Sequence, residues 1–296
     1  MDTDLFSAFR PQPEPDMPIG VDEAEPSMKA LTTAQRLMWL NADRVLYVGL
    51  FGESSVRNMG AFSIYISLNR PHRICMDGGA WEDTALSVVA PYARHRIISG
   101  ERLLCNLMIE PESVEIEGLP RFLRDARGAV CAPQALRTMR DALKRSMRCG
   151  IGQHPSTEHF DGSFFGSALP ERHVDRRIRG VLDKIKQDPN SQTSAEASAR
   201  MSCLSVSRFL HLFRAEVGMP FRSFRTWQRA RSVLYHVTQS TSLANIALDA
   251  GYPDSTHFSH SVRRAFGVTP KSLFASCRRL APHASGAPAS PRGEYV

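Results

Sequence analysis

The chain has 296 residues, of which 42% are hydrophobic, 23% charged and 8% aromatic. These proportions are typical of globular proteins, exclude a fibrous or largely disordered chain, and leave room for two domains that each bury a core. No apolar run reaches the roughly 18 residues that span a bilayer, and the first residues are acidic where a secretory signal would be basic. We therefore expect a cytoplasmic protein.

The net charge of +7 is unevenly distributed along the chain. Residues 171–280 contain 18 Lys and Arg against 8 Asp and Glu, whereas residues 1–170 carry a small acidic excess. A surface that only needs solvation usually mixes the two signs more evenly. The basic C-terminal region therefore indicates a polyanionic partner, nucleic acid above all.

The N-terminal half is predicted to be a β domain. Residues 1–28 combine five prolines with acidic residues and are predicted to form a disordered arm. In residues 29–150, short apolar runs at 45–50, 62–68, 86–89, 95–98 and 103–109 alternate with turn residues. This pattern predicts the strands of a small antiparallel barrel or sandwich.

Residues 133–148 are predicted to form an amphipathic helix, because Leu136, Met139, Leu143 and Met147 recur at helical spacing. We predict that this apolar stripe forms a homodimer. The alternative is that the stripe packs on the β domain of its own chain.

Residues 151–171 are rich in His, Pro, Gly and Ser and are predicted to be a linker. Residues 172–280 have helical periodicity throughout, with expected helices at 173–187, 194–200, 204–217, 221–237, 243–250, 254–266 and 270–279. Residues 281–296 are predicted to be a disordered tail.

The helical region contains an internal repeat with an offset of 49 residues. The first copy comprises Phe209, His211, Phe213, Arg214, Val217 and Gly218, and the second comprises Phe258, His260, Val262, Arg263, Phe266 and Gly267. In each copy a short helix, a tight turn and a longer helix follow one another. This arrangement predicts two helix-turn-helix units joined by a long helix.

The longer helix of each unit has a face that is free to contact DNA. Packing of the Phe209 and Phe258 sides into a core turns the opposite face outward. We assign DNA binding to Ser207, Arg208, Leu210, His211 and Arg214 in the first unit and to Ser255, Thr256, Ser259, His260 and Arg263 in the second. Small hydroxyl side chains allow close approach, and His or Arg can donate to guanine or to phosphate.

Residues 246–270, which begin Ile-Ala-Leu-Asp-Ala-Gly-Tyr and end Phe-Gly-Val-Thr-Pro, resemble the signature of the AraC/XylS family of bacterial transcription regulators. Residues 204–218 match the first unit of that family, and the resemblance covers residues 172–280. It implies an all-α DNA-binding domain fused to a cupin-like barrel, with promoter DNA, RNA polymerase, a small-molecule effector and a second copy of the chain as partners. His211 and His260 replace an Arg that is frequent in the family.

Enzymatic alternatives lack their required residues. A metal-dependent cupin-type enzyme fused to a DNA-binding unit needs closely spaced histidines with a carboxylate, whereas His72 and His95 are isolated. A DNA-repair methyltransferase needs a Pro-Cys-His setting, but Cys131 lies between Val130 and Ala132. A DNA-packing protein would not need the acidic N-terminal half. We expect no catalytic residue, cofactor or metal.

The six cysteines have no pair at metal-binding or redox spacing, and we predict reduced thiols in the core. A redox-sensing cysteine is the alternative, which requires an exposed thiol of low pKa.

Overall fold

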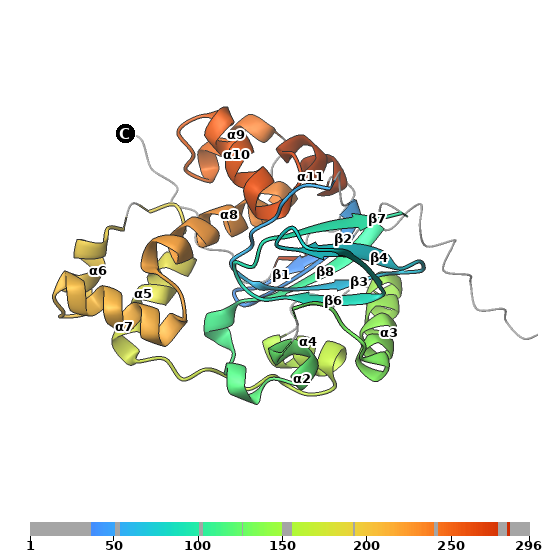
Figure 1. Ribbon diagram of the computed structural model, residues 1–296. Coiled ribbons are helices and arrows are strands. Elements are labelled where there is room, and N and C mark those ends of the chain that lie inside the picture. Colours follow the sequence, from blue (N-terminus) through green and yellow to red (C-terminus); the bar gives the residue numbers. More distant parts are fainter. Residues whose placement is uncertain are drawn as a thin grey trace, which may run out of the picture.

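The computed structural model describes residues 37–50, 54–100, 103–125, 127–149, 156–191, 193–239, 242–277 and 283–284. A β domain with three covering helices precedes a helical domain that contains two helix-turn-helix units (Figure 1). The predicted fold class is thus confirmed. The predicted arm, residues 1–28, lies outside the described residues, as does the predicted tail, residues 281–296, apart from residues 283–284.

Two sheets form the β domain, in the strand orders β10-β1-β2-β8-β3-β6-β9 and β5-β4-β7. All pairings are antiparallel except that of β10 with β1. The strands are β1 Leu37–Leu40, β2 Arg44–Leu50, β3 Phe62–Ile66, β4 His72–Met76, β5 Trp81–Thr84, β6 Leu86–Val89, β7 His95–Ser99, β8 Leu103–Ile109, β9 Gly128–Ala129 and β10 His283–Ala284.

All five strands expected from the sequence are present, as β2, β3, β6, β7 and β8. The sequence did not predict β4 and β5, which form the small sheet with β7. Strand β5 has the sequence Trp-Glu-Asp-Thr and no fully buried residue, so it carries none of the apolar alternation that identifies a strand.

The larger sheet is buried on both faces. In β2, Val45 and Tyr47 belong to one core, and Leu46 and Val48 belong to the other, as the two-residue period of a strand requires. The first core also contains side chains of the small sheet and of the helical domain. The second core is covered by α3 and α4, which lie on the opposite side of the sheet in Figure 1.

In the described part of the β domain there are three α-helices, together with the short 3₁₀ helices η1 (Pro111–Ser113) and η2 (Ile116–Gly118). They are α2 (Arg121–Arg124), α3 (Pro133–Cys149) and α4 (Thr157–Phe165).

The predicted dimer contact of α3 is corrected by its packing. Met139, Leu143 and Met147 are buried against the sheet of their own chain, and Leu136 is partly buried there. This covers the apolar stripe that we assigned to a homodimer, so the alternative of packing within the chain is the observed one.

The predicted linker, residues 151–171, is also corrected where it is described, from residue 156 on. Ser156 caps α4, whose Phe160 stacks on Trp39 with ring centroids 4.5 Å apart. Asp161 forms a buried bidentate pair with Arg44, at 2.7 and 2.8 Å. Two aromatic residues four positions apart give this polar segment an apolar face, which its Gly and Ser content concealed.

The helical domain comprises α5 Arg176–Gln187, α6 Ala195–Met201, α7 Val206–Val217, α8 Phe221–Gln239, α9 Leu243–Asp249, α10 Ser255–Phe266 and α11 Pro270–Cys277. The side chains of Ser194, Ser205, Ser242 and Asp254 cap α6, α7, α9 and α10, each accepting from a backbone N–H three residues on. All seven helices expected from the sequence are therefore confirmed to within a few residues.

Of the described cysteine side chains, Cys75 and Cys105 are buried, whereas Cys131 and Cys203 are exposed. The prediction of core thiols is therefore wrong for the latter two. Burial raises the pKa of the Cys105 thiol. None of the described helices combines the length and apolar character that a membrane span requires.

Candidate nucleic-acid interface

The first helix-turn-helix unit consists of α6 and α7. Phe209, Phe213 and Val217 of α7 are buried, and their core includes side chains of α5 and the start of α8. The helix ends at Gly218, whose φ of 80° places it in the left-handed region. The opposite face of α7 points away from the core.

The second unit, α9 and α10, repeats this design. Phe258, Val262 and Phe266 are buried, and Gly267 ends α10 with a φ of 69°. Val262 is fully buried, so it fills the core position that Phe213 occupies in the first unit.

The turns of the two units have the same hydrogen bonds. In the first turn, the backbone N–H of Leu204 donates to the Ala199 carbonyl at 2.9 Å. In the second turn, the backbone N–H of Tyr252 donates to the Ala247 carbonyl at 3.0 Å. The residue before each donor is left-handed, with φ of 53° and 65°. The repeat seen in the sequence is thus a repeat of backbone geometry.

The predicted site residues lie on the outer faces of α7 and α10. Those of α7 are all exposed, including Leu210 at 40%. On α10, Ser259 is half-buried and the others are exposed. Each unit therefore presents a helical face with hydroxyl, imidazole and guanidinium groups, which is a chemical set that can contact base edges and phosphates.

Buried charges join the helical domain to the β domain, and sequence reasoning missed them. Arg231 of α8 lies 2.8 Å from Glu110, which follows β8, and Trp227 donates to the same carboxylate at 2.9 Å. Lys186 of α5 pairs with Asp43 at 2.7 Å and with Glu112 at 2.9 Å. Charged residues spaced far apart in the sequence carry no local signal of such pairs.

These contacts change proton affinities. Burial and the neighbouring Glu112 raise the pKa of Glu110 to about 7, against the pull of Arg231 and Lys186. Burial disfavours the charge on Lys186, but Glu112 and Asp43 outweigh it and raise the pKa of the ammonium group. The interface between the domains thus depends on charges that are strongly coupled to one another.

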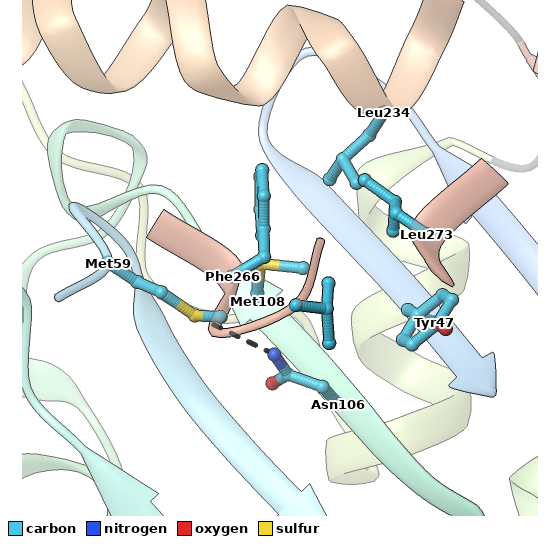
Figure 2. Close-up of a pocket in the computed structure, with 8 residues that line it drawn as sticks. Tyr47, Met59, Asn106, Met108, Leu234, Phe266 and Leu273 are labelled. Carbon is cyan, nitrogen blue, oxygen red and sulfur yellow. Dashed lines mark hydrogen bonds between the residues drawn. The ribbon is translucent and has the colours of Figure 1, made fainter. Parts of the chain in front are cut away.

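An apolar cavity of about 20 Å³ lies where the second unit meets the larger sheet (Figure 2). Asn106 lies on its wall and donates to the Met59 sulfur at 3.8 Å. The other lining residues are Tyr47, Met108, Leu234, Phe266, Val268 and Leu273. Its volume suits about one water molecule, far below the roughly 300 Å³ of a typical ligand pocket.

The isolated histidines of the β domain have structural partners. His72 lies 2.8 Å from the hydroxyls of Ser67 and Ser87, and His95 lies 2.7 Å from the Tyr65 hydroxyl. Burial lowers the pKa of each imidazole to about 4. In the described part of the chain, no group of three or more His, Cys, Asp or Glu residues is placed to hold a metal.

Comparison with known proteins supports the same assignment. Residues 198–276 match the model of a helix-turn-helix domain family. The arabinose operon regulatory protein of Escherichia coli is 29% identical over 106 residues, which are 35% of this chain and 36% of that protein. The virulence regulon transcriptional activator VirF of Yersinia enterocolitica is 32% identical over 114 residues, 37% of this chain and 40% of the relative. The chain thus covers little more than a third of the length of these regulators.

The crystal structure of ToxT from Vibrio cholerae shares the fold of both domains. The likeness has a TM-score of 0.53 at 11% identity, over 80% of this chain and 100% of ToxT. A structure of ToxT bound to an unsaturated fatty acid gives a TM-score of 0.52 at 12% identity, over 82% of this chain and 98% of ToxT.

A sheet domain followed by paired helix-turn-helix units defines a class of two-domain proteins with a tandem helix-turn-helix fold. Within this class, residues 198–276 of the chain are similar to the helix-turn-helix regions of bacterial transcription regulators, which agrees with the AraC/XylS resemblance of the sequence.

Proposed function

We propose that the protein is a transcriptional regulator that binds specific sequences in double-stranded DNA. The observation that carries this proposal is the doubled exposed face of α7 and α10 in a domain with 18 Lys and Arg against 8 Asp and Glu. A single amphipathic helix is common in proteins. Two helices with equivalent turns, caps and outward polar residues fit two successive major grooves on one side of a duplex.

Within each face, position along the helix gives each residue a role. His211 and His260 lie in the middle, where a side chain meets base edges, and the exposed Leu210 fits the methyl group of thymine. Arg214 and Arg263 lie one turn later and hold phosphates. Ser207, Arg208, Ser255, Thr256 and Ser259 complete the two contact faces.

The direct test is selection of binding sites from random duplexes by the full-length protein. We expect a site of two unlike half-elements about one helical turn apart. Roughly 6 to 8 phosphate contacts should give a slope of log affinity against log salt near −5 to −7. Failure to enrich any sequence would contradict the proposal.

We also propose that an effector acts where the second unit meets the β domain. ToxT is described with an unsaturated fatty acid bound, and the cavity of Figure 2 has an apolar lining. At about 20 Å³ it must open before it admits such a molecule, so binding and separation of the two surfaces would be linked. We further propose that the protein is not an enzyme, that it acts in the bacterial cytoplasm and that it contacts RNA polymerase. We also propose a homodimer, formed through a surface other than the apolar stripe of α3.

A further inference from the structure

A second group of basic residues lies outside the two faces of α7 and α10. It lines a cleft of about 930 Å³ between α8 and α10, closed on one side by Asn58, Gly60 and Tyr92 of the β domain. This cleft is separate from the apolar cavity of Figure 2 and shares none of its lining residues.

Two helical stripes converge on the cleft. Arg222, Arg225 and Arg229 of α8 are spaced by three and four residues, so they lie on one side of that helix. Ser261 and Arg264 of α10 follow the same rule and line the opposite wall. None of the described residues that line the cleft is acidic.

The four guanidinium groups are not neutralised within the described part of the chain. No carboxylate there lies within ion-pair distance of them, whereas Arg231, two positions after Arg229, pairs with Glu110 at 2.8 Å. The buried Nε of Arg229 has no hydrogen-bond partner among the described residues. Among the described residues, Arg231 of α8 thus has a carboxylate partner, whereas Arg222, Arg225 and Arg229 of the same helix have none.

The geometry of the arginines is partly fixed. Arg225 donates to the Ser191 carbonyl at 3.2 Å, and its guanidinium lies 5.9 Å from the centroid of the Phe221 ring. Burial and the like charge of Arg229 lower the pKa of Arg225. Positive groups held close together against their mutual repulsion are stabilised when an anion enters between them.

We propose that this cleft binds phosphate groups. The planar fork of arginine matches phosphate oxygens bidentately, and several arginines without a carboxylate favour a ligand with more than one negative charge. Two sources share this chemistry: the DNA backbone between the two half-elements, which rests on the proposed function, and a free phosphorylated small molecule.

The experiment uses the full-length protein in two assays. The first is the salt dependence of affinity for the selected duplex and for an unrelated duplex. The second is calorimetric titration with inorganic pyrophosphate. The variants are Arg225→Gln/Arg229→Gln and, at two exposed positions where folding is not at risk, Arg222→Gln/Arg264→Gln. The control is Arg121→Gln/Arg145→Gln, which removes two exposed charges from α2 and α3.

If the phosphates belong to DNA, each cleft variant should flatten the salt slope by roughly 2, since one contact contributes about 0.9. The loss should be equal on both duplexes. If the ligand is a free molecule, pyrophosphate should bind to the parent protein and bind at least tenfold more weakly to both cleft variants, with an unchanged slope.

The proposal is overturned if neither cleft variant differs from the control in either assay. Should the parent protein bind no duplex, the proposed function fails, and the pyrophosphate assay alone then decides for or against the cleft.

Discussion

The two helix-turn-helix units are alike in backbone but differ in how they are attached. The first unit buries four phenylalanines of α7 and α8 in a core with α5, and its ties to the β domain include the ion pairs of Lys186. The second unit shares one apolar core with the larger sheet, in which Phe258 and Phe266 join Tyr47 and Met108. In Figure 1, α9 to α11 lie on one side of the sheets, with α11 nearest to the strands, whereas α6 and α7 lie at the far end of α8.

This difference determines how a change in the β domain is transmitted to each helix-turn-helix unit. Apolar packing is insensitive to salt and pH but sensitive to shape, so a movement of the sheet acts on the second unit through contact. Buried ion pairs respond to protonation and to the loss of either partner. The first unit is therefore coupled to the β domain by charge, and the second by packing.

The largest expected effect on stability comes from deleting a buried ring, and it distinguishes the core of the first unit from the core of the second. Phe266→Ala and Phe213→Ala should each destabilise the protein by about 3–5 kcal/mol, because each deletes a buried ring. Only Phe266→Ala should also increase hydrogen exchange in β8, which lines the shared core. Equal exchange in β8 for both variants would contradict the difference in attachment.

The ionic attachment of the first unit is tested at Lys186. Lys186→Gln leaves Asp43 and Glu112 without their partner in a buried setting and should cost about 3 kcal/mol in unfolding free energy. The matched control is Lys184→Gln on the exposed side of α5, which should change stability by less than about 0.5 kcal/mol. Urea unfolding measures both, and an equal effect would remove the assigned role of the ion pairs.

The glycines that end α7 and α10 provide the closest comparison. Both are left-handed, but a Cβ on Gly218 meets nothing nearer than 3.8 Å, whereas one on Gly267 would lie 2.5 Å from the Nε of Arg57. Gly218→Ala should therefore cost about 1 kcal/mol from backbone strain alone. Gly267→Ala should cost about 3 kcal/mol, since the β domain must also move away. Thermal unfolding of the two variants checks this ranking, which a reversed order would refute.

The raised pKa of Glu110 predicts that the stability of the folded protein depends on pH. Its pKa of about 7 in the folded protein exceeds the ordinary value of 4.5, so the folded state holds this proton more tightly than the unfolded state. The contribution to stability is therefore fullest at low pH and falls as pH rises from about 4.5 to 7, by about 2 kcal/mol between pH 5 and pH 7. Glu110→Gln should lose less stability over that interval. A parallel decline in both proteins would show that another group is responsible.

The sequence predicted the helical domain well because its signals are local. Caps such as Ser242 and Asp254, and the apolar spacing around Phe209 and Phe258, act within one or two turns of helix. The exposed faces of α7 and α10 were predicted from the same apolar spacing. Repetition made this inference stronger, because the same pattern occurred twice at a fixed offset.

What the sequence did not predict depends on long-range contacts. Helix α4 is stabilised by the stacking of Phe160 on Trp39 and by the pairing of Asp161 with Arg44, which is 117 residues away. The placement of the α3 stripe required knowing that the larger sheet has two buried faces. The arginines of α8 did have the spacing of a helical stripe, and that signal, read together with α10, could have indicated the cleft.

We propose above that both helix-turn-helix units bind DNA, each at its own half-element. Quantitative site selection with His211→Ala and His260→Ala in the full-length protein tests it most directly. Each substitution should cost about 1–3 kcal/mol at the preferred site and relax base preference at one or two positions. The positions relaxed by His211→Ala should fall in one half-element and those relaxed by His260→Ala in the other. A uniform loss on all duplexes, or relaxation of the same positions by both variants, would contradict the account.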